Sequence, residues 1–317
     1  MFIERITEIA LFRRLQTWHR RSHCRTGDLS MSNPSIADRR RTFRALHERG
    51  CFVIPNPWNA GTARYLQGLG FKALATTSAG FAHSLGYSDG EETLEMTLDH
   101  CREIVAVTDL PVNCDFEGGF AHDPAGVAEN VRRCIETGVA GLSIEDSTGD
   151  AAEPLYDFDT ALARVRAARQ AIDAAGGDVV FTARSEGFIA GRPDMAETVR
   201  RLKAFADAGA DCLYAPGIKT ADQIDTVVRA VAPLPVNLLM SFSGGLSVDD
   251  IAALGVRRIS TGGTLSRVAM QGFMKAAREI AEQGTFGGLA GVMSNAELNT
   301  FFHDDLPRRP KPDNQTP

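Results

Sequence analysis

A membrane-spanning helix needs about 18 consecutive apolar residues, and no stretch of this sequence approaches that length. We therefore expect no membrane-spanning segment. Basic residues are not in excess either, because 34 Lys and Arg stand against 40 Asp and Glu, for a formal net charge of −6. Since nucleic-acid binding depends on a basic surface, we expect no nucleic-acid partner.

Cysteine occurs without the close pairs that mark a zinc site or a redox motif. None of the 6 cysteines belongs to a C-x-x-C pair, and most lie within apolar runs. Single cysteines of this kind are typical of reduced, buried thiols in a cytoplasmic protein. The sequence thus predicts neither a disulfide framework nor a zinc site.

The composition is that of an ordinary folded protein, with 317 residues of which 44% are hydrophobic and 23% charged. This length suits two average domains or one α/β barrel of about 250 residues. Residues 1–30 form a basic extension without a secretory cleavage site, and whether they belong to the native protein is left open. We expect the barrel to occupy residues 31–303 and residues 304–317 to form a mobile tail.

Short apolar runs alternate with longer amphipathic segments through the body of the chain. A lead helix at about residues 35–49 precedes eight such pairs, and an extra helix is expected at 294–302. Eight alternations predict a single parallel (β/α)8 barrel of the TIM type, in the α/β class. A doubly wound fold is disfavoured because no glycine-rich phosphate-binding motif follows the first strand. The predicted strands are 52–55, 73–77, 111–115, 141–145, 179–183, 212–215, 235–239 and 258–261.

Acidic side chains recur at every second position around the end of the third strand. Asp115 and Glu117 thus share the face that we expect to point to the barrel mouth, while Cys114 faces the surrounding helices. Glu145 ends the fourth strand with the same parity. Three carboxylates at one mouth repel one another, and a divalent cation relieves this repulsion. All-oxygen ligands favour Mg²⁺, with Mn²⁺ as an alternative.

Other candidate site residues lie at strand ends or in the loops that follow. Arg184 ends the fifth strand and could either bind a substrate carboxylate bidentately or neutralise a neighbouring glutamate. A Schiff-base aldolase is not expected, because no lysine falls at a strand end. The remaining candidates are Trp58 and Asn237 as substrate contacts, the backbone N–H groups of Ser78, Ala79 and Gly80 as anion donors, and Asp89 as a metal-shell carboxylate or a turn residue.

Taken in order along the chain, these motifs resemble those of the isocitrate lyase/phosphoenolpyruvate mutase superfamily. The resemblance covers about residues 35–302 and rests on five segments: 56–60 (Asn-Pro-Trp-Asn-Ala), 77–80 (Thr-Ser-Ala-Gly), 115–120 (Asp-Phe-Glu-Gly-Gly-Phe), 143–146 (Ser-Ile-Glu-Asp) and 182–184 (Thr-Ala-Arg). It implies a barrel that binds Mg²⁺ and acts on a small 2-oxo or 2-hydroxy acid through an enolate-like intermediate. It also implies a homodimer or homotetramer whose subunits exchange the final helix.

The resemblance also implies a role for each matching residue. Asp115, Glu117 and Glu145 match the acidic Mg²⁺ shell, and Asp89 matches the loop aspartate near the metal. Residues 78–80 match the loop that binds a substrate carboxylate, and Arg184 matches the arginine that clamps the substrate.

The loop after the fourth strand departs from the family pattern. Residues 146–154 read Asp-Ser-Thr-Gly-Asp-Ala-Ala-Glu-Pro, whereas members that cleave isocitrate or methylisocitrate have Lys-Arg-Cys-Gly-His here, with the Cys as acid/base. The Asp-Lys, Pro-Lys and Asn pattern of the phosphonate mutases is also missing. The members that cleave isocitrate or methylisocitrate also place a glutamate at the end of the sixth strand, where this chain has Tyr214 followed by Ala-Pro.

These features predict a Mg²⁺-dependent carbon–carbon lyase or decarboxylase for a small oxo- or hydroxy-dicarboxylate, with oxaloacetate first. Decarboxylation demands least of the loop, because CO₂ leaves without a general base. Retro-aldol cleavage would need a base, and Tyr214, His122 or Glu186 would have to serve. Two alternatives stay open: a phosphonopyruvate mutase or hydrolase, and a barrel that binds a 2-oxo acid without turning it over.

Overall fold

The computed structural model describes residues 34–309, so the predicted extension at 1–30 lies outside the described range. Eight parallel strands form one sheet in the order β1-β8-β7-β6-β5-β4-β3-β2. The Ala75 N–H donates to the Pro55 carbonyl oxygen at 3.1 Å, which links β2 to the end of β1 and nearly closes the sheet. The predicted barrel is confirmed. Its strands are β1 (Phe52–Ile54), β2 (Leu74–Ala75), β3 (Val112–Asp115), β4 (Gly141–Glu145), β5 (Val180–Arg184), β6 (Cys212–Tyr214), β7 (Val236–Leu239) and β8 (Arg258–Ser260).

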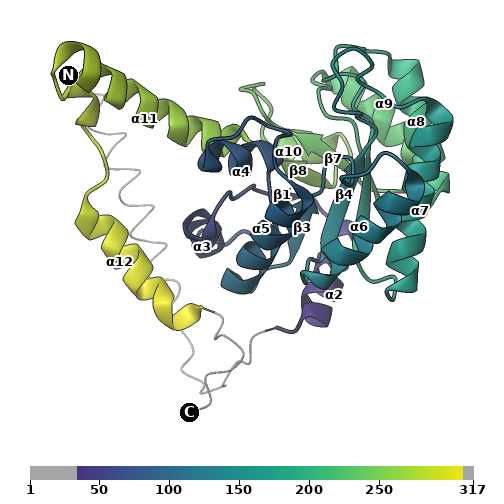
Figure 1. Ribbon diagram of the computed structural model, residues 1–317, viewed down its shortest axis with the longest axis horizontal. Helices are drawn as coiled ribbons and strands as arrows, with labels where there is room; N and C mark the ends of the chain where they lie inside the picture. The colour runs from purple at the N-terminus through teal and green to yellow at the C-terminus, as the bar shows by residue number, and fades with distance from the viewer. Residues whose placement is uncertain (1–33, 310–317) are drawn as a thin grey trace. The chain divides into compact units, whose positions relative to one another are not determined.

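Helices follow the strands and cover the outside of the sheet (Figure 1). Short polar side chains start most of them, as in α2, where Ser35 and Asp38 form a capping box. The helices are α2 (Ile36–Glu48), α3 (Ala60–Gly68), α4 (Ser78–Leu85), α5 (Leu94–Val107), α6 (Pro124–Glu136), α7 (Phe158–Ala174), α8 (Met195–Asp207), α9 (Ala221–Val231), α10 (Val248–Ala253), α11 (Thr264–Gln283) and α12 (Asn295–Asp305), with 3₁₀ turns η1 (Gly287–Leu289) and η2 (Leu306–Arg308).

The main core lies between the sheet and its helices, and a smaller cluster fills the amino-terminal end of the barrel. In this smaller cluster Phe43 of α2 packs with Ile54, Ala75 and Val180. Gly141 makes the approach possible, because a Cβ at this position would lie 2.5 Å from a ring carbon of Phe43. The lead helix therefore closes one end of the barrel and leaves the carboxyl ends of the strands as the open face.

The extra helix expected at 294–302 is α12, and it extends to Asp305. Asp305 is buried and accepts hydrogen bonds from Nε and Nη2 of Arg64 on α3. The rings of Phe301 and Tyr65 lie 4.9 Å apart, so α12 packs on α3 of the same chain. The boundary at residue 304 that we expected for the tail thus falls inside this helix, and exchange of the helix between subunits stays a prediction.

The thiols follow the expected pattern wherever the structure describes them. Cys51, Cys101, Cys114, Cys134 and Cys212 are free, and all but Cys51 are buried. The Sγ of Cys114 lies 3.0 Å from that of Cys101 on α5, so Cys114 faces the helices and not the barrel interior. Between residues 34 and 309, no helix combines the length and apolarity needed to cross a bilayer.

His47 of α2 lies at the closed end of the barrel in its neutral form. Its Nδ1 is 2.8 Å from the Phe43 carbonyl oxygen, and its Nε2 is 3.3 Å from Nη1 of Arg258. One nitrogen thus donates and the other accepts, as only the neutral ring can. Burial, and then the positive charge of Arg258, lower the pKa of His47 to about 3.

We expect acid to destabilise the protein partly through His47. Between about pH 3 and pH 6.5 the unfolded chain binds a proton at this residue and the folded chain does not, so the free energy of unfolding falls as the pH is lowered. His47→Gln should reduce that dependence by up to about 1.4 kcal/mol per pH unit. Urea unfolding at about pH 4.5, 5.5 and 6.5 measures the slope, and equal slopes in parent and variant would contradict the expectation.

Candidate active site

A small polar cavity of about 190 Å³ lies at the carboxyl ends of the strands. Because pockets for drug-sized ligands measure about 300–1,000 Å³, this smaller cavity suits a metabolite of a few carbon atoms. Inward-facing side chains from β3 to β8 form much of its wall. Of the predicted site residues, those that line it are Ser78, Ala79, Asp89, Asp115, Arg184, Tyr214 and Asn237.

Arg184 stands at the centre of the charged groups at this mouth. Its Nη1 lies 2.6 Å from Oδ1 of Asp115 and 3.0 Å from Oε2 of Glu145. Its Nε lies 2.8 Å from Oε1 of Glu186. One guanidinium thus joins carboxylates from β3, β4 and the loop after β5, so Arg184 neutralises neighbouring acids in this structure.

Asp115 also accepts hydrogen bonds from the first residue of α4. The Ser78 N–H and hydroxyl both lie 3.2 Å from Oδ2 of Asp115, and the partial positive charge at a helix start favours this contact. The Gly80 N–H does not point into the cavity but donates to the Thr77 hydroxyl at 3.3 Å. The predicted anion-binding segment therefore divides, with Ser78 and Ala79 on the cavity and Gly80 outside its lining.

Glu117 and Glu145 lie beside the cavity wall. Burial, and then the neighbouring Glu92 and Asp115, raise the pKa of Glu117 to about 9. Burial raises the pKa of Glu145 to about 8 although Arg184 opposes the shift. Glu117 also has a φ of 46°, a left-handed conformation that costs a non-glycine residue energy. With these pKa values Glu117 and Glu145 keep their protons near neutral pH, because this corner of the site gathers more carboxyl groups than its arginine can compensate.

The donor set fits a divalent cation that keeps part of its water shell. Oε1 of Glu117 is buried and has no hydrogen-bond partner within residues 34–309. In the same range, no three His, Cys, Asp or Glu side chains are arranged to hold an ion by themselves. Mg²⁺ usually retains several waters and takes one or two carboxylates, so the arrangement agrees with such an ion better than with a closed protein cage.

Asp89 and Tyr214 both line the cavity, and they come from segments that are far apart in the sequence. Asp89 comes from the loop after α4, and burial followed by the charge of Asp115 raises its pKa. Burial raises the pKa of Tyr214 to about 12, and the Arg184 guanidinium lies 5.1 Å from the centre of its ring. A phenol with this pKa stays protonated near neutral pH, so Tyr214 can donate a hydrogen bond there but cannot act as a general base.

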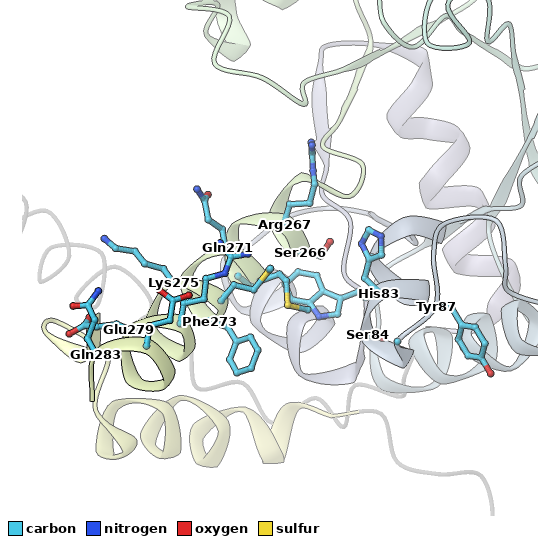
Figure 2. A pocket seen from close by; sticks show the side chains of 18 residues that line it. His83, Ser84, Tyr87, Ser266, Arg267, Gln271, Phe273, Lys275, Glu279 and Gln283 are labelled. Carbon is cyan, nitrogen blue, oxygen red and sulfur yellow. The ribbon is translucent and has the colours of Figure 1, made fainter. Parts of the chain in front are cut away.

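Trp58 and Gly80 instead line a second, larger cavity of about 1,200 Å³ between α4 and α11. Figure 2 shows His83, Ser84 and Tyr87 on one side of it and a row of α11 side chains, from Arg267 to Gln283, on the other. The structure thus does not bring Trp58 to the lining of the polar cavity.

Sequence reasoning missed several residues that shape the polar cavity. Asn56 accepts hydrogen bonds at Oδ1 from the N–H groups of Thr261 and Gly262, at 2.9 Å each, and so fixes the end of β8. Arg258 lines the cavity from inside β8, where the pattern of a barrel strand predicts an apolar or small residue. Glu92 lies beside Glu117, and burial raises its pKa. The Asn–Pro turn after the first strand was a signal for Asn56, whereas nothing in the sequence marked Glu92.

Comparison with known proteins identifies the family. A model of the phosphoenolpyruvate phosphomutase family matches residues 43–281. The chain belongs to the isocitrate lyase/phosphoenolpyruvate mutase superfamily. A solved structure from Burkholderia cenocepacia J2315, assigned provisionally as a lyase/mutase, is 47% identical, with a TM-score of 0.81 over 84% of this chain and 97% of that one.

Two curated relatives extend the comparison. An oxaloacetate decarboxylase of Chromohalobacter salexigens is 32% identical over 248 residues, which cover 73% of this chain and 82% of the relative. An uncharacterized protein of Mycobacterium tuberculosis is 31% identical over 243 residues, which cover 76% of this chain and 89% of that protein. The superfamily match confirms the resemblance that the motifs indicated.

In this superfamily member a buried arginine secures the loop that contains Glu117. Arg164 of α7 is 1% exposed, and its guanidinium donates to the carbonyl oxygens of Gly118, Ala121 and His122. The side-chain amide of Asn130 on α6 donates to the carbonyl oxygens of Gly119 and Phe120, at 2.9 and 3.2 Å. These bonds hold the loop that places Glu117 in its left-handed conformation.

We expect Arg164→Met to destabilise the protein strongly, because it leaves three loop carbonyl oxygens without their donor. An unsatisfied buried polar group costs about 1–3 kcal/mol, so the free energy of unfolding should fall by on the order of 3 kcal/mol. Asn130→Ala is the matched comparison and should cost about 1 kcal/mol. Urea unfolding followed by circular dichroism measures both, and similar losses in the two variants would contradict this assignment.

Proposed function

We propose that the protein is a Mg²⁺-dependent lyase that breaks a bond at C3 of a small 2-oxo dicarboxylate, with decarboxylation of oxaloacetate as its first candidate reaction. The observation that carries the proposal is the joint lining of one small polar cavity by Asp115 and Arg184. The oxaloacetate decarboxylase among the relatives supports this substrate class.

Asp115, Glu117 and Glu145 would hold the cation partly through its water molecules, with Asp89 in the outer part of the same water shell. The crowding of carboxyl groups that raises the pKa of Glu117, which a cation would relieve, and the unpartnered Oε1 of Glu117 support this role. A bound Mg²⁺ supplies a Lewis acid that polarises the 2-oxo group and stabilises negative charge on its oxygen.

Arg184 and the start of α4 would bind a substrate carboxylate. The hydrogen bonds and ion pairs of Arg184 with described residues use Nε and Nη1, which leaves Nη2 to meet an oxygen of the ligand. Ala79 borders the same cavity and offers its backbone N–H at a helix start, where anions bind favourably, whereas the N–H and the hydroxyl of Ser78 already meet Asp115.

Decarboxylation agrees best with the available acids and bases. The loop from 146 to 157 contains no Lys, Cys or His, and Glu186 is engaged by Arg184. Tyr214 stays protonated and would donate a hydrogen bond to developing negative charge. Loss of CO₂ asks for stabilisation of the electrons left on the substrate and for no proton abstraction, which this set of residues can provide.

We expect the purified protein to convert oxaloacetate to pyruvate and CO₂ with Mg²⁺ and to lose this activity in EDTA. Asp115→Asn should lower kcat/KM by on the order of 100-fold, because it removes a charged group that would face both the ion and Arg184. Proton NMR follows the conversion, with enzyme-free samples to subtract spontaneous and metal-driven decay. Asp99→Asn, an exposed aspartate on α5, is the matched control and should behave as the parent.

Unchanged turnover in Asp115→Asn would contradict the proposed site. A second candidate, cleavage or rearrangement of phosphonopyruvate, follows from the family description and would appear as a Mg²⁺-dependent change in the phosphorus spectrum. Binding of these acids without any product would favour the non-catalytic barrel.

We propose that a second copy of the chain covers the exposed apolar side chains of α11, in a homodimer or a homotetramer. We also propose that this assembly is located in the cytoplasm. Phe273 is 68% exposed and Val268 62%, with Met270, Met274 and Ile280 also exposed on this helix. Contiguous exposed apolar surface of this kind marks a protein interface, and most soluble oligomers are symmetric assemblies of identical chains.

Phe273→Asp should dissociate this assembly, because it places a charge within the apolar surface. Size-exclusion chromatography with light scattering should give a mass of two or four chains for the parent and a smaller mass for the variant. Gln283→Asp adds a charge at the polar end of the same helix and should leave the mass unchanged. A monomeric parent at every concentration would contradict the proposal.

A further inference from the structure

Arg258 is a buried arginine inside the barrel that the proposed chemistry does not use. It begins β8, is 3% exposed and lines the polar cavity. Its Nε donates to Oδ1 of Asn237 at 2.8 Å, its Nη2 to the Thr182 hydroxyl at 3.0 Å, and its Nη1 lies 3.3 Å from Nε2 of His47. All three partners are neutral, and they occupy only part of the donor capacity of a guanidinium.

No carboxylate compensates the charge of Arg258, in contrast to several other arginines of the described residues. Arg184 and Arg64 pair with carboxylates, and Arg164 meets three carbonyl oxygens away from the cavity. None of the ion pairs found within residues 34–309 includes Arg258. A buried charge without a counter-charge is costly, and this one borders a space that a ligand can enter.

The position of Arg258 gives the cavity a second cationic end. Its partner Thr182 precedes Arg184 by two residues on β5 and shares its inward face. At a rise of about 3.3 Å per residue, the Arg258 guanidinium lies roughly 5–7 Å further into the barrel than the end of β5. Around it, Ser143 and Asn113 line the wall, and Oδ1 of Asn113 is buried without a hydrogen-bond partner within the described residues.

We propose that the inner end of this cavity is a second anion subsite, in which Arg258 binds the distal carboxylate of the ligand while the Ala79 N–H and Arg184 receive the other end. The unpartnered Asn113 oxygen would accept a hydrogen bond from a hydroxyl group or an ordered water beside it. The subsite favours dicarboxylates over monocarboxylates. This inference deepens the proposed function and rests on it for the identity of the substrate.

Succinate is a suitable probe, because it is a dicarboxylate without a reactive 2-oxo group. Calorimetry in EDTA should show succinate binding to the parent at least 10-fold more tightly than acetate at equal ionic strength. Arg258→Gln should remove this preference, and Arg258→Lys, which keeps the charge but not the planar fork, should weaken succinate several-fold. Arg257→Gln is the matched control, since the neighbouring Arg257 donates to the Gly50 carbonyl oxygen outside the cavity and should bind succinate as the parent does.

A purely structural role for Arg258 would lower the thermal midpoint of Arg258→Gln while leaving the succinate preference intact, and that result would overturn the inference. If Arg258→Gln does not fold, a crystal structure of the parent with succinate decides, because a carboxylate away from Arg258 would equally overturn it. The two hypotheses fail separately: a parent that decarboxylates oxaloacetate but shows no Arg258-dependent preference rejects only the subsite. A parent that binds succinate through Arg258 but converts no substrate rejects the proposed reaction.

Discussion

The arrangement of the mouth depends on one guanidinium surrounded by carboxylates. Arg184 ties Asp115, Glu145 and Glu186 together, and so fixes the ends of three neighbouring structural segments relative to one another. Its single charge does not balance these acids together with Asp89 and Glu117, whose pKa values are raised. The mouth therefore gathers more carboxyl groups than one guanidinium can compensate, and the cation that we propose would relieve this crowding.

Two more arginines give the loops around this charge a fixed shape. Arg164 holds the loop after β3 through its carbonyl oxygens, and Arg201 of α8 contacts both Asp146, at 3.0 Å, and the Tyr156 carbonyl oxygen, at 2.9 Å, across the loop after β4. Asp146 in turn accepts from the Glu186 N–H at 2.7 Å. The loop after β4 is thus anchored at both of its ends.

The sequence predicted the barrel and much of the cavity because both follow from short-range patterns. Apolar runs located all eight strands, and the alternation of side chains placed Asp115 inward and Cys114 outward. Trp58 and Gly80 could not be placed in this way, since the path of a loop after a strand has no periodicity. Arg258 was overlooked for the opposite reason, because strand patterns lead one to expect a barrel interior without charge. The buried state of Tyr214, which removes it as a base, depends on tertiary packing that no local pattern encodes.

The lead helix restricts the route by which a ligand can reach and leave the cavity. Phe43 fills the amino-terminal end of the barrel against Gly141, so in the part of the chain that the structure describes a ligand cannot reach the cavity from that end. In the reaction that we propose, substrate would enter and products would leave at the carboxyl ends of the strands, beside Ser78 and Arg184. Product release would then be sequential, and a fragment that leaves the outer position slowly would block the exit of a fragment bound behind it.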